Sequence, residues 1–169
     1  MSRAFVKEPE GALVGEPDMD LPQSPHPAYI TPRGKRALET RLEELRAERD
    51  RMVEAGETFE TSLHLAQVER DIRYYETRLE RAIVVDPAKQ HPEEVGFGAT
   101  VTVADPDGNR QTYEIVGEDE MDVDNNRIPW VSPLATALIG NGPGDTITWK
   151  RPAGDLELEI VDLRYPDAE

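Results

Sequence analysis

The sequence predicts an α+β protein, in which an N-terminal antiparallel helical hairpin that forms a coiled coil precedes an antiparallel sheet domain with one short helix. Three observations lead to this fold class. Two apolar stripes with heptad spacing lie on either side of a short link, short alternating runs replace them from residue 97 onward, and one capped helix falls within the sheet region.

The first helix begins at a strong N-terminal signal, because Thr31 is a good N-cap and Pro32 suits the first helical position. Its stripe alternates intervals of four and three, with Arg49 in the one slot that is not apolar. The apolar members are Leu38, Leu42, Leu45 and Met52. Gly56 ends the run, as glycine commonly does at helix C-termini.

A second stripe with the same spacing follows directly, in Leu65, Val68, Ile72, Tyr75, Leu79 and Ala82. Neither helix could bury its stripe alone, and a link of a few residues makes the two helices antiparallel neighbours. We therefore expect a hairpin over residues 30–86, with arms of roughly 24 residues that project about 35 Å. The alternative, two helices of a globular bundle, lacks a third helix to complete it.

The segments that flank the hairpin differ from it in composition. Residues 1–29 hold five prolines and no apolar period, which predicts a disordered, acidic tail. A linker over 87–96 precedes the sheet domain, which we expect over 97–165, and residues 166–169 form a second tail.

Four short runs in the sheet domain alternate and are bounded by turn residues, at 99–103, 111–116, 145–150 and 156–163. Between them, Ser132 caps, Pro133 opens and Gly140 closes one short helix. Trp130 and Trp149 are expected to pack on the core or on a sheet face.

Composition excludes several classes of site and location. The chain has 169 residues, no cysteine and three widely separated histidines, which argues against disulfides, a cysteine nucleophile and a zinc site. No apolar run is long enough to span a bilayer and no secretory signal is present, so a cytoplasmic protein without a membrane partner is expected.

The charge is strongly negative and unevenly spread. A net charge of −16 argues against binding to free DNA, because the phosphates would be repelled. Residues 31–86 hold 11 of the 19 basic residues, whereas residues 87–169 hold six basic and 17 acidic residues. The acidic half therefore suits a basic protein partner.

Six short motifs occur in a recognisable order: 31–34 (TPRG), 85–86 (VD), 97–101 (FGATV), 115–120 (IVGEDE) with Asp122, 132–140 (SPLATALIG) and 144–145 (GD). Together they resemble the GreA/GreB family of transcription elongation factors over about residues 30–165, including its short-hairpin, Rnk-like members. The resemblance implies an FKBP-like C-terminal domain that binds the rim of the secondary channel of bacterial RNA polymerase. It also implies that the hairpin inserts into that channel and that the chain works as a monomer.

The tip of the hairpin is where the resemblance implies chemistry. Family members that stimulate transcript cleavage have a glycine, an acid, two further residues and Glu-Asn, and residues 56–61 (GETFET) correspond to that stretch. Glu57 and Glu60 would then help to hold a Mg²⁺ ion of the polymerase active centre and orient a water against the RNA. The chain itself would bind no cofactor stably and would not be an enzyme on its own.

An alternative remains open at the tip. Glu57 replaces an aspartate, Thr61 replaces an asparagine, and each arm is shorter than in cleavage factors by roughly two turns. The hairpin could therefore occupy the channel without promoting cleavage. Acids in the first turn of a helix are also favoured by the helix dipole alone.

Two further groups of candidate residues follow from the resemblance. The polymerase-docking group, expected to contact a basic coiled coil, is Glu118, Asp119, Glu120, Asp122, Ser132 and Pro133. The group that could contact the RNA 3′ end or the channel wall is Arg46, Arg49, Arg51, Arg70 and Arg73. Acids at helical pair spacing favour a salt-bridged, solvated face for these arginines, and Ser132 also serves as a plain helix cap.

Two other function classes compete with a polymerase-binding regulator. A prolyl isomerase would follow from an FKBP-like domain, but it needs a pocket lined with aromatic residues, and these make up only 6% of the chain. A generic coiled-coil adaptor without a polymerase link is the other.

Overall fold

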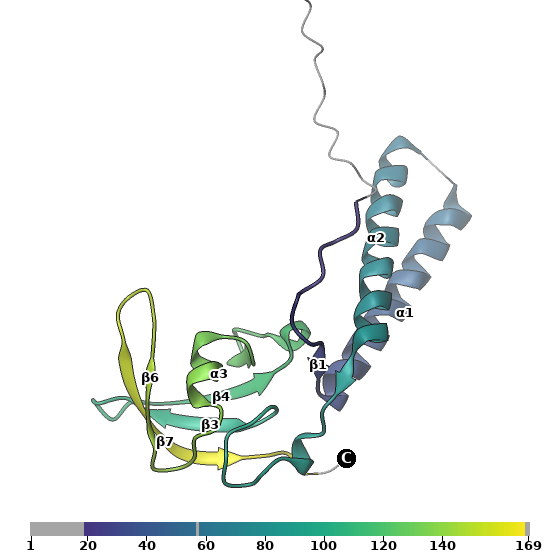
Figure 1. Ribbon diagram of the computed structural model, residues 1–169. Helices are drawn as coiled ribbons and strands as arrows, with labels where there is room; N and C mark the ends of the chain where they lie inside the picture. Colours follow the sequence, from purple (N-terminus) through teal and green to yellow (C-terminus); the bar gives the residue numbers. More distant parts are fainter. Residues whose placement is uncertain (1–18, 57, 168–169) are drawn as a thin grey trace, which may run out of the picture.

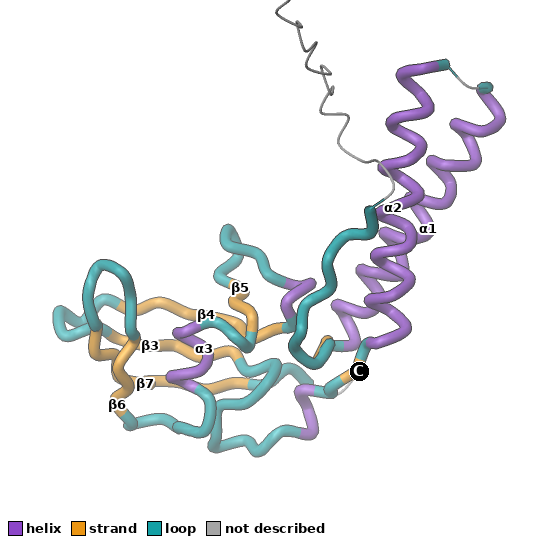
Figure 2. The backbone as a smooth tube through the Cα atoms, turned by 45° about the horizontal axis from the view of Figure 1, so that its top comes forward, coloured by secondary structure: helices purple, strands orange, loops and turns teal. Residues whose placement is uncertain are grey.

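The computed structural model describes residues 19–56 and 58–167, and they form two units. A pair of long helices projects from one end of a curled sheet domain, and residues 19–30 lie alongside the helices (Figure 1). The tube view in Figure 2 shows the same arrangement from another side. The predicted fold class is confirmed.

The helical hairpin consists of α1, Pro32–Ala55, and α2, Phe59–Arg81. Gly56 follows α1 with φ of 86°, a left-handed conformation that glycine adopts without strain. The predicted stripes face each other: a buried cluster joins Leu42 and Leu45 to Val68 and Ile72, with Met52, Tyr75 and Leu79 packed against it. Burial of this seam holds the two arms together.

The base of the hairpin is closed by a small parallel sheet. Strand β1, Tyr29–Ile30, pairs with β2, Ile83–Val84. The sequence predicted a disordered tail over residues 1–29, but Tyr29 belongs to this strand, so the ordered part begins earlier; residues 1–18 lie outside the described residues. A strand of two residues is too short to show the alternation of apolar and polar residues by which strands are recognised. Its partner, about fifty residues away, adds no local signal.

The sheet domain contains five strands in the order β5-β4-β3-β7-β6. Their bounds are Thr100–Ala104 (β3), Arg110–Val116 (β4), Arg127–Pro129 (β5), Thr146–Trp149 (β6) and Leu156–Arg164 (β7). Four of them are the predicted ones and pair antiparallel, while β5 was not predicted and runs parallel to β4. A strand of three residues that contains a proline carries too little pattern to be recognised.

The core of this domain lies between the sheet and α3, Pro133–Leu138. Along β3 the side chains alternate, so that Val101 and Val103 are buried while their neighbours are partly exposed. Leu134, Ala135 and Leu138 of α3 join them. Trp130 and Trp149 pack against this core, as predicted.

Residues 85–99 connect the two units and are held against the sheet domain. A short 3₁₀ helix, η1 (Pro87–Lys89), opens the segment, and Val95 is buried in the core. The hydroxyl of Tyr165 donates to the carbonyl of Glu94 (2.5 Å) and accepts from the N–H of Gly96 (2.8 Å). The predicted linker 87–96 is therefore packed and hydrogen-bonded at its C-terminal end.

Across residues 19–56 and 58–167, no helix combines the length and the apolar character needed to cross a membrane.

Replacing Leu45 by Ala tests the seam of the hairpin. Leu45 is 1% exposed, so L45A removes apolar contacts and leaves a cavity, and the free energy of unfolding should fall by about 2 to 5 kcal/mol. Chemical denaturation followed by circular dichroism measures the change. Ala47→Ser, on the exposed face of the same helix, is the control and should be nearly neutral; an equal loss in both variants contradicts the assigned seam.

Candidate functional site

The tip of the hairpin is built by a reciprocal cap. The Thr58 hydroxyl accepts from the N–H of Thr61 (3.3 Å), and the Thr61 hydroxyl accepts from the N–H of Thr58 (2.6 Å). These bonds satisfy two of the free N–H groups at the start of α2. The side chain of Thr61, which stands where cleavage factors were expected to have an asparagine, is thus engaged in the cap.

Glu60 lies in the first turn of α2, on the exposed surface of the tip. The partial positive charge at this helix end favours a carboxylate there. Beside it Phe59 is 81% exposed, and Leu63 one turn later is exposed as well. Glu57, the other predicted tip carboxylate, lies outside the described residues. Within the described chain, no three His, Cys, Asp or Glu side chains gather closely enough to hold a metal ion.

The predicted RNA-contacting arginines lie on the hairpin, and four of the five have acidic partners. Arg46 reaches across the hairpin to Glu76 (2.7 Å). The other three pairs are Arg49 with Asp50 (2.8 Å), Arg70 with Asp71 (3.4 Å) and Arg73 with Asp20 (2.8 Å). Arg51 is exposed. The hairpin face is therefore mostly salt-bridged.

The corner between β4 and β5 connects the sheet domain to the hairpin. It contains a 3₁₀ turn, η2 (Glu118–Glu120), which includes three of the predicted docking acids. Asp119 accepts from Nε of Arg78 (2.8 Å to Oδ2), and the Arg78 side chain is only 2% exposed. Arg78 lies in the last turn of α2, where a cation is favoured.

The contact with Asp119 stabilises the charged form of Arg78 in its buried position. Burial by itself would lower the pKa of Arg78, but the hydrogen bonds donated to Asp119 and the negative charge of that carboxylate outweigh burial and raise the pKa above its ordinary value. Arg78 is therefore a buried cation whose described counter-ion, Asp119, comes from the other unit.

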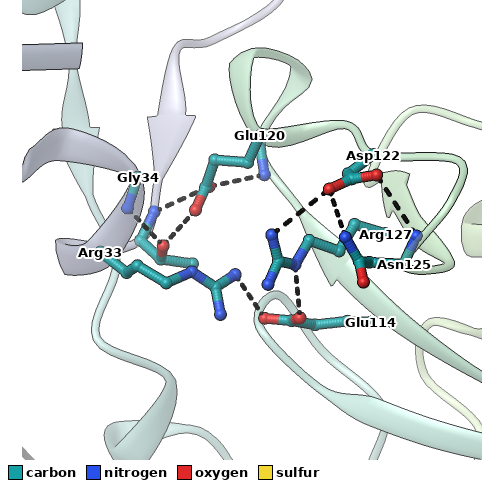
Figure 3. Close-up of polar contacts among 9 residues, drawn as sticks. Arg33, Gly34, Glu114, Glu120, Asp122, Asn125 and Arg127 are labelled. Atoms are coloured by element: carbon teal, nitrogen blue, oxygen red, sulfur yellow. Dashed lines mark hydrogen bonds and ion pairs between the residues drawn. The ribbon is translucent and has the colours of Figure 1, made fainter. Parts of the chain in front are cut away.

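Glu120 connects the same corner to the start of α1 (Figure 3). One carboxylate oxygen accepts from the backbone N–H of Thr31 (3.1 Å) and of Gly117 (3.0 Å), and the other accepts from the Thr31 hydroxyl. A Cβ at Gly34 would lie 2.2 Å from the Glu120 side chain, so a larger residue there would displace the carboxylate from its bonds to Thr31. The N-cap of α1 and the acidic turn thus form one hydrogen-bonded unit.

A chain of ion pairs extends this contact over the surface, and Figure 3 shows its members between α1 and the sheet domain. Arg33 donates to Glu114 (2.7 Å), which also accepts from Nε of Arg127 (3.2 Å). Arg127 then lies 3.7 Å from Asp122, which accepts from the side chain of Asn125 (2.7 Å). The hydrogen bond from Asn125 is the main reason why the pKa of Asp122 lies below its ordinary value.

The predicted docking residues therefore divide into two groups. Asp119 and Glu120 are bound to the hairpin, so their carboxylates hold the two units together. Ser132 accepts from the N–H of Ala135 (3.3 Å) as the cap of α3, and Pro133 beside it is exposed. The loop after η2 instead exposes two apolar side chains, Met121 (58%) and Val123 (77%), on either side of Asp122.

The contact between the hairpin and the sheet domain, which we call the junction, includes residues on both units that the sequence did not identify as members of it. The residues concerned are Thr31, Arg33, Gly34 and Arg78 on the hairpin and Glu114 and Arg127 on the sheet domain. The motif at 31–34 contained a usable signal. Glycine is unfavourable within a helix, so Gly34 in the first turn indicates that another group approaches the backbone closely there.

Comparison with known proteins identifies similar sequences. A family model described as "Transcription elongation factor, GreA/GreB, C-term" matches residues 89–165. The transcription elongation factor GreB of Neisseria meningitidis serogroup B is 38% identical over 152 residues, covering 81% of this chain and 93% of the relative. GreA of Francisella philomiragia is 41% identical, covering 80% and 95%.

A solved structure of a GreA/GreB factor from Nitrosomonas europaea is 27% identical, covers 81% of this chain and 98% of that one, and superposes with a TM-score of 0.41.

Replacing Asp119 by Ala tests the junction. The change leaves the Arg78 charge buried without its partner, so we expect a loss of about 3 to 5 kcal/mol in the free energy of unfolding. Denaturant titration measures this loss. Asp124→Ala removes an exposed acid nearby and should change stability little; an equally small effect of D119A contradicts the role assigned to the pair.

Replacing Asn125 by Ala tests the electrostatics of the loop. Because the folded state holds the pKa of Asp122 below its ordinary value of about 4, Asp122 adds stability above that pH and loses it as the pH falls through the lowered value. Asn125→Ala should raise the pKa of Asp122 toward its ordinary value, as followed by NMR of the carboxyl carbon. An unchanged titration curve contradicts the proposed cause.

Proposed function

The chain belongs to the GreA/GreB family of transcription elongation factors, and from this premise we propose that it docks its sheet domain on the rim of the RNA polymerase secondary channel and inserts the hairpin. Relatives of 38 to 41% identity whose length the chain nearly covers establish the family. Elongation factors act on RNA polymerase, and on this basis the proposed location of the chain is the cytoplasm. The chain acts through the polymerase rather than as an enzyme on its own.

The observation that carries the proposal is the anchored base of the hairpin. A narrow rod can deliver its tip to a defined point only if its base has a fixed direction relative to the docking domain. Asp119 holds the end of α2 and Glu120 holds the start of α1, so both arms are fixed at the same turn. The tip with Glu60 lies at the opposite end of the two helices (Figure 1).

At the tip, the proposed chemistry is assistance to metal-dependent cleavage of the transcript. Glu60 offers an exposed carboxylate, and Glu57 would add a second; carboxylates are suitable ligands for Mg²⁺. The Mg²⁺ ion of the polymerase supplies a polarised water or phosphate. The part of this chain is to place Glu60 beside the ion, while Arg51 is available to contact the RNA or the channel wall.

The proposed contact with polymerase is the part of the predicted docking surface that is not bound to the hairpin. It comprises Asp122 with the flanking Met121 and Val123, and the start of α3 at Ser132 and Pro133. Acidic and apolar groups side by side suit a basic, amphipathic helix of the partner.

A second candidate function is occupancy of the channel without cleavage, and hairpin length favours it. The alignment with the Neisseria protein spans 152 positions, whereas 81% of 169 residues is about 137, so about 15 positions of that relative have no counterpart here. If these fall in the arms of 24 and 23 residues, the tip stops short of the catalytic metal. The same complex would then block other factors.

A backtracked elongation complex with labelled RNA distinguishes the two candidates. With the wild-type chain we expect Mg²⁺-dependent shortening of the transcript. The Glu57→Gln/Glu60→Gln double variant should lose on the order of a hundredfold in cleavage rate, in the range found when a charge-stabilising group is removed. Glu54→Gln, an exposed acid at the end of α1, is the matched control and should cleave normally.

The remaining outcomes are equally informative. No shortening by the wild type, together with inhibition of a known cleavage factor, supports occupancy without cleavage. No binding to polymerase at all contradicts both candidates.

A further inference from the structure

Residues 19–30, which we call the strap, cross from the hairpin to the sheet domain. Figures 1 and 2 both show the strap running beside α2 down to β1. At its start, Asp20 accepts from Nε of Arg73 on α2 (2.8 Å). At its end, the backbone N–H groups of Ile83 and Val85 donate to the carbonyls of Ala28 (2.8 Å) and Ile30 (2.9 Å).

Between these two ends the strap packs on the sheet domain. The Tyr29 ring meets Trp130 edge-on with centroids 5.1 Å apart, and the His26 ring meets the same indole at 6.1 Å. His26 Nδ1 also lies 3.4 Å from Glu118 of η2. A Cβ at Gly117 would lie 2.3 Å from the carbonyl oxygen of Tyr29, so the backbones are in close contact. Such aromatic edge contacts add to burial and give the strap a defined position.

The strap forms one wall of a shallow hollow of about 370 Å³. Its lining is His26 from the strap together with Trp130, Val131, Thr136 and Ile139 from the segment that enters and forms α3. Ile139 is 38% exposed. The hollow therefore offers an apolar floor directly beside Ser132 and Pro133, where docking is proposed.

Two features of the hollow indicate what it accepts. Its rim is acidic on the side of the strap, where Glu118 lies beside His26. In addition, one carboxylate oxygen of Glu118 and the indole Nε1 of Trp130 are buried and have no hydrogen-bond partner among the described residues. An apolar floor with an acidic rim is complementary to a helix that presents an apolar side chain between basic ones.

We propose that the strap is part of the polymerase-docking surface: His26 completes a hollow with Trp130, Thr136 and Ile139 that receives an apolar side chain from a basic helix of the polymerase. The proposal rests on the proposed function and adds to it a segment N-terminal to the hairpin. A partner in the hollow thus contacts the sheet domain and the strap, and the strap is itself bound to α2 through Asp20 and Arg73.

Binding of purified core RNA polymerase to the full-length chain at fixed salt, measured by interferometry, tests the proposal with two variants and two controls. Thr136→Arg places a cation in the hollow from an exposed position, and His26→Ala removes the strap's wall. Each should weaken binding on the order of tenfold, as for a central contact of an interface. Thr148→Arg, the same change at an exposed position of strand β6 that does not line the hollow, and Met19→Ala, an exposed strap residue, should bind as the wild type does.

Each of the other possible results overturns a specific part of the proposal. If Thr136→Arg weakens binding and His26→Ala does not, the strap is not part of the surface, although the docking of α3 stands. If neither variant matters while the wild type binds, the hollow is not the contact and the proposed function survives. If the wild type does not bind, both fail. If the wild type forms dimers that Thr136→Arg dissolves, a second copy rather than polymerase occupies the hollow.

Discussion

The rest of the structure depends on one acidic turn. In η2, consecutive carboxylates face the two arms of the hairpin: Asp119 neutralises the buried Arg78 at the end of α2, and Glu120 binds Thr31 at the start of α1. A buried cation without its partner is costly, so the sheet domain and the hairpin each complete the other. Without this turn, the described contacts that remain between the rod and its base are those of the strap and the β1–β2 pair, the connecting segment and the outer ion pairs.

Through this arrangement, an acidic sequence motif of the sheet domain holds the hairpin in position. The turn faces inward with two carboxylates, and the loop that follows faces outward with Met121, Asp122 and Val123. Positioning the rod and offering a surface to a partner are thus tasks of adjacent residues. A change in one is expected to affect the other, because Arg127 links Asp122 to Glu114 and, through it, to Arg33 of α1.

Much of the fold follows from local pattern. Heptad spacing identified both arms of the hairpin, and the caps at Thr31 and Ser132 identified helix starts, because these signals lie within a few residues of each other. The β1–β2 pair, the parallel strand β5 and the partners of Asp119 and Glu120 were not predicted. The β1–β2 pair and the contacts of Asp119 and Glu120 join segments about forty to ninety residues apart, and a single sequence holds no periodicity that records such contacts. Strand β5 lies only 13 residues from its partner on β4, but its three residues, one of them a proline, are too few to show a strand pattern.

The site was predicted less completely than the fold. An acidic cluster followed by a helix cap suggests a surface that binds a partner. The motif itself does not show which carboxylates face solvent and which one faces Arg78. The glycine at position 34 was the one local sign of a close approach. Four of the five candidate arginines of the hairpin have acidic partners, as expected, but none of these partners is at the helical pair spacing on which the expectation rested. Asp50 and Asp71 are sequence neighbours of their arginines, Glu76 lies on the facing arm and Asp20 lies in the strap.

The distance between the two units in solution tests most directly whether the acidic turn fixes the hairpin on the sheet domain. The chain has no cysteine, so spin labels at Glu54→Cys near the tip and Thr148→Cys on β6 report a single pair of sites by pulsed electron resonance. We predict one narrow distance distribution in the otherwise unchanged chain, and a broad one when Asp119→Ala and Glu120→Ala are added. A broad distribution without those changes, or a narrow one that survives them, would contradict the claim that the acidic turn fixes the hairpin on its base.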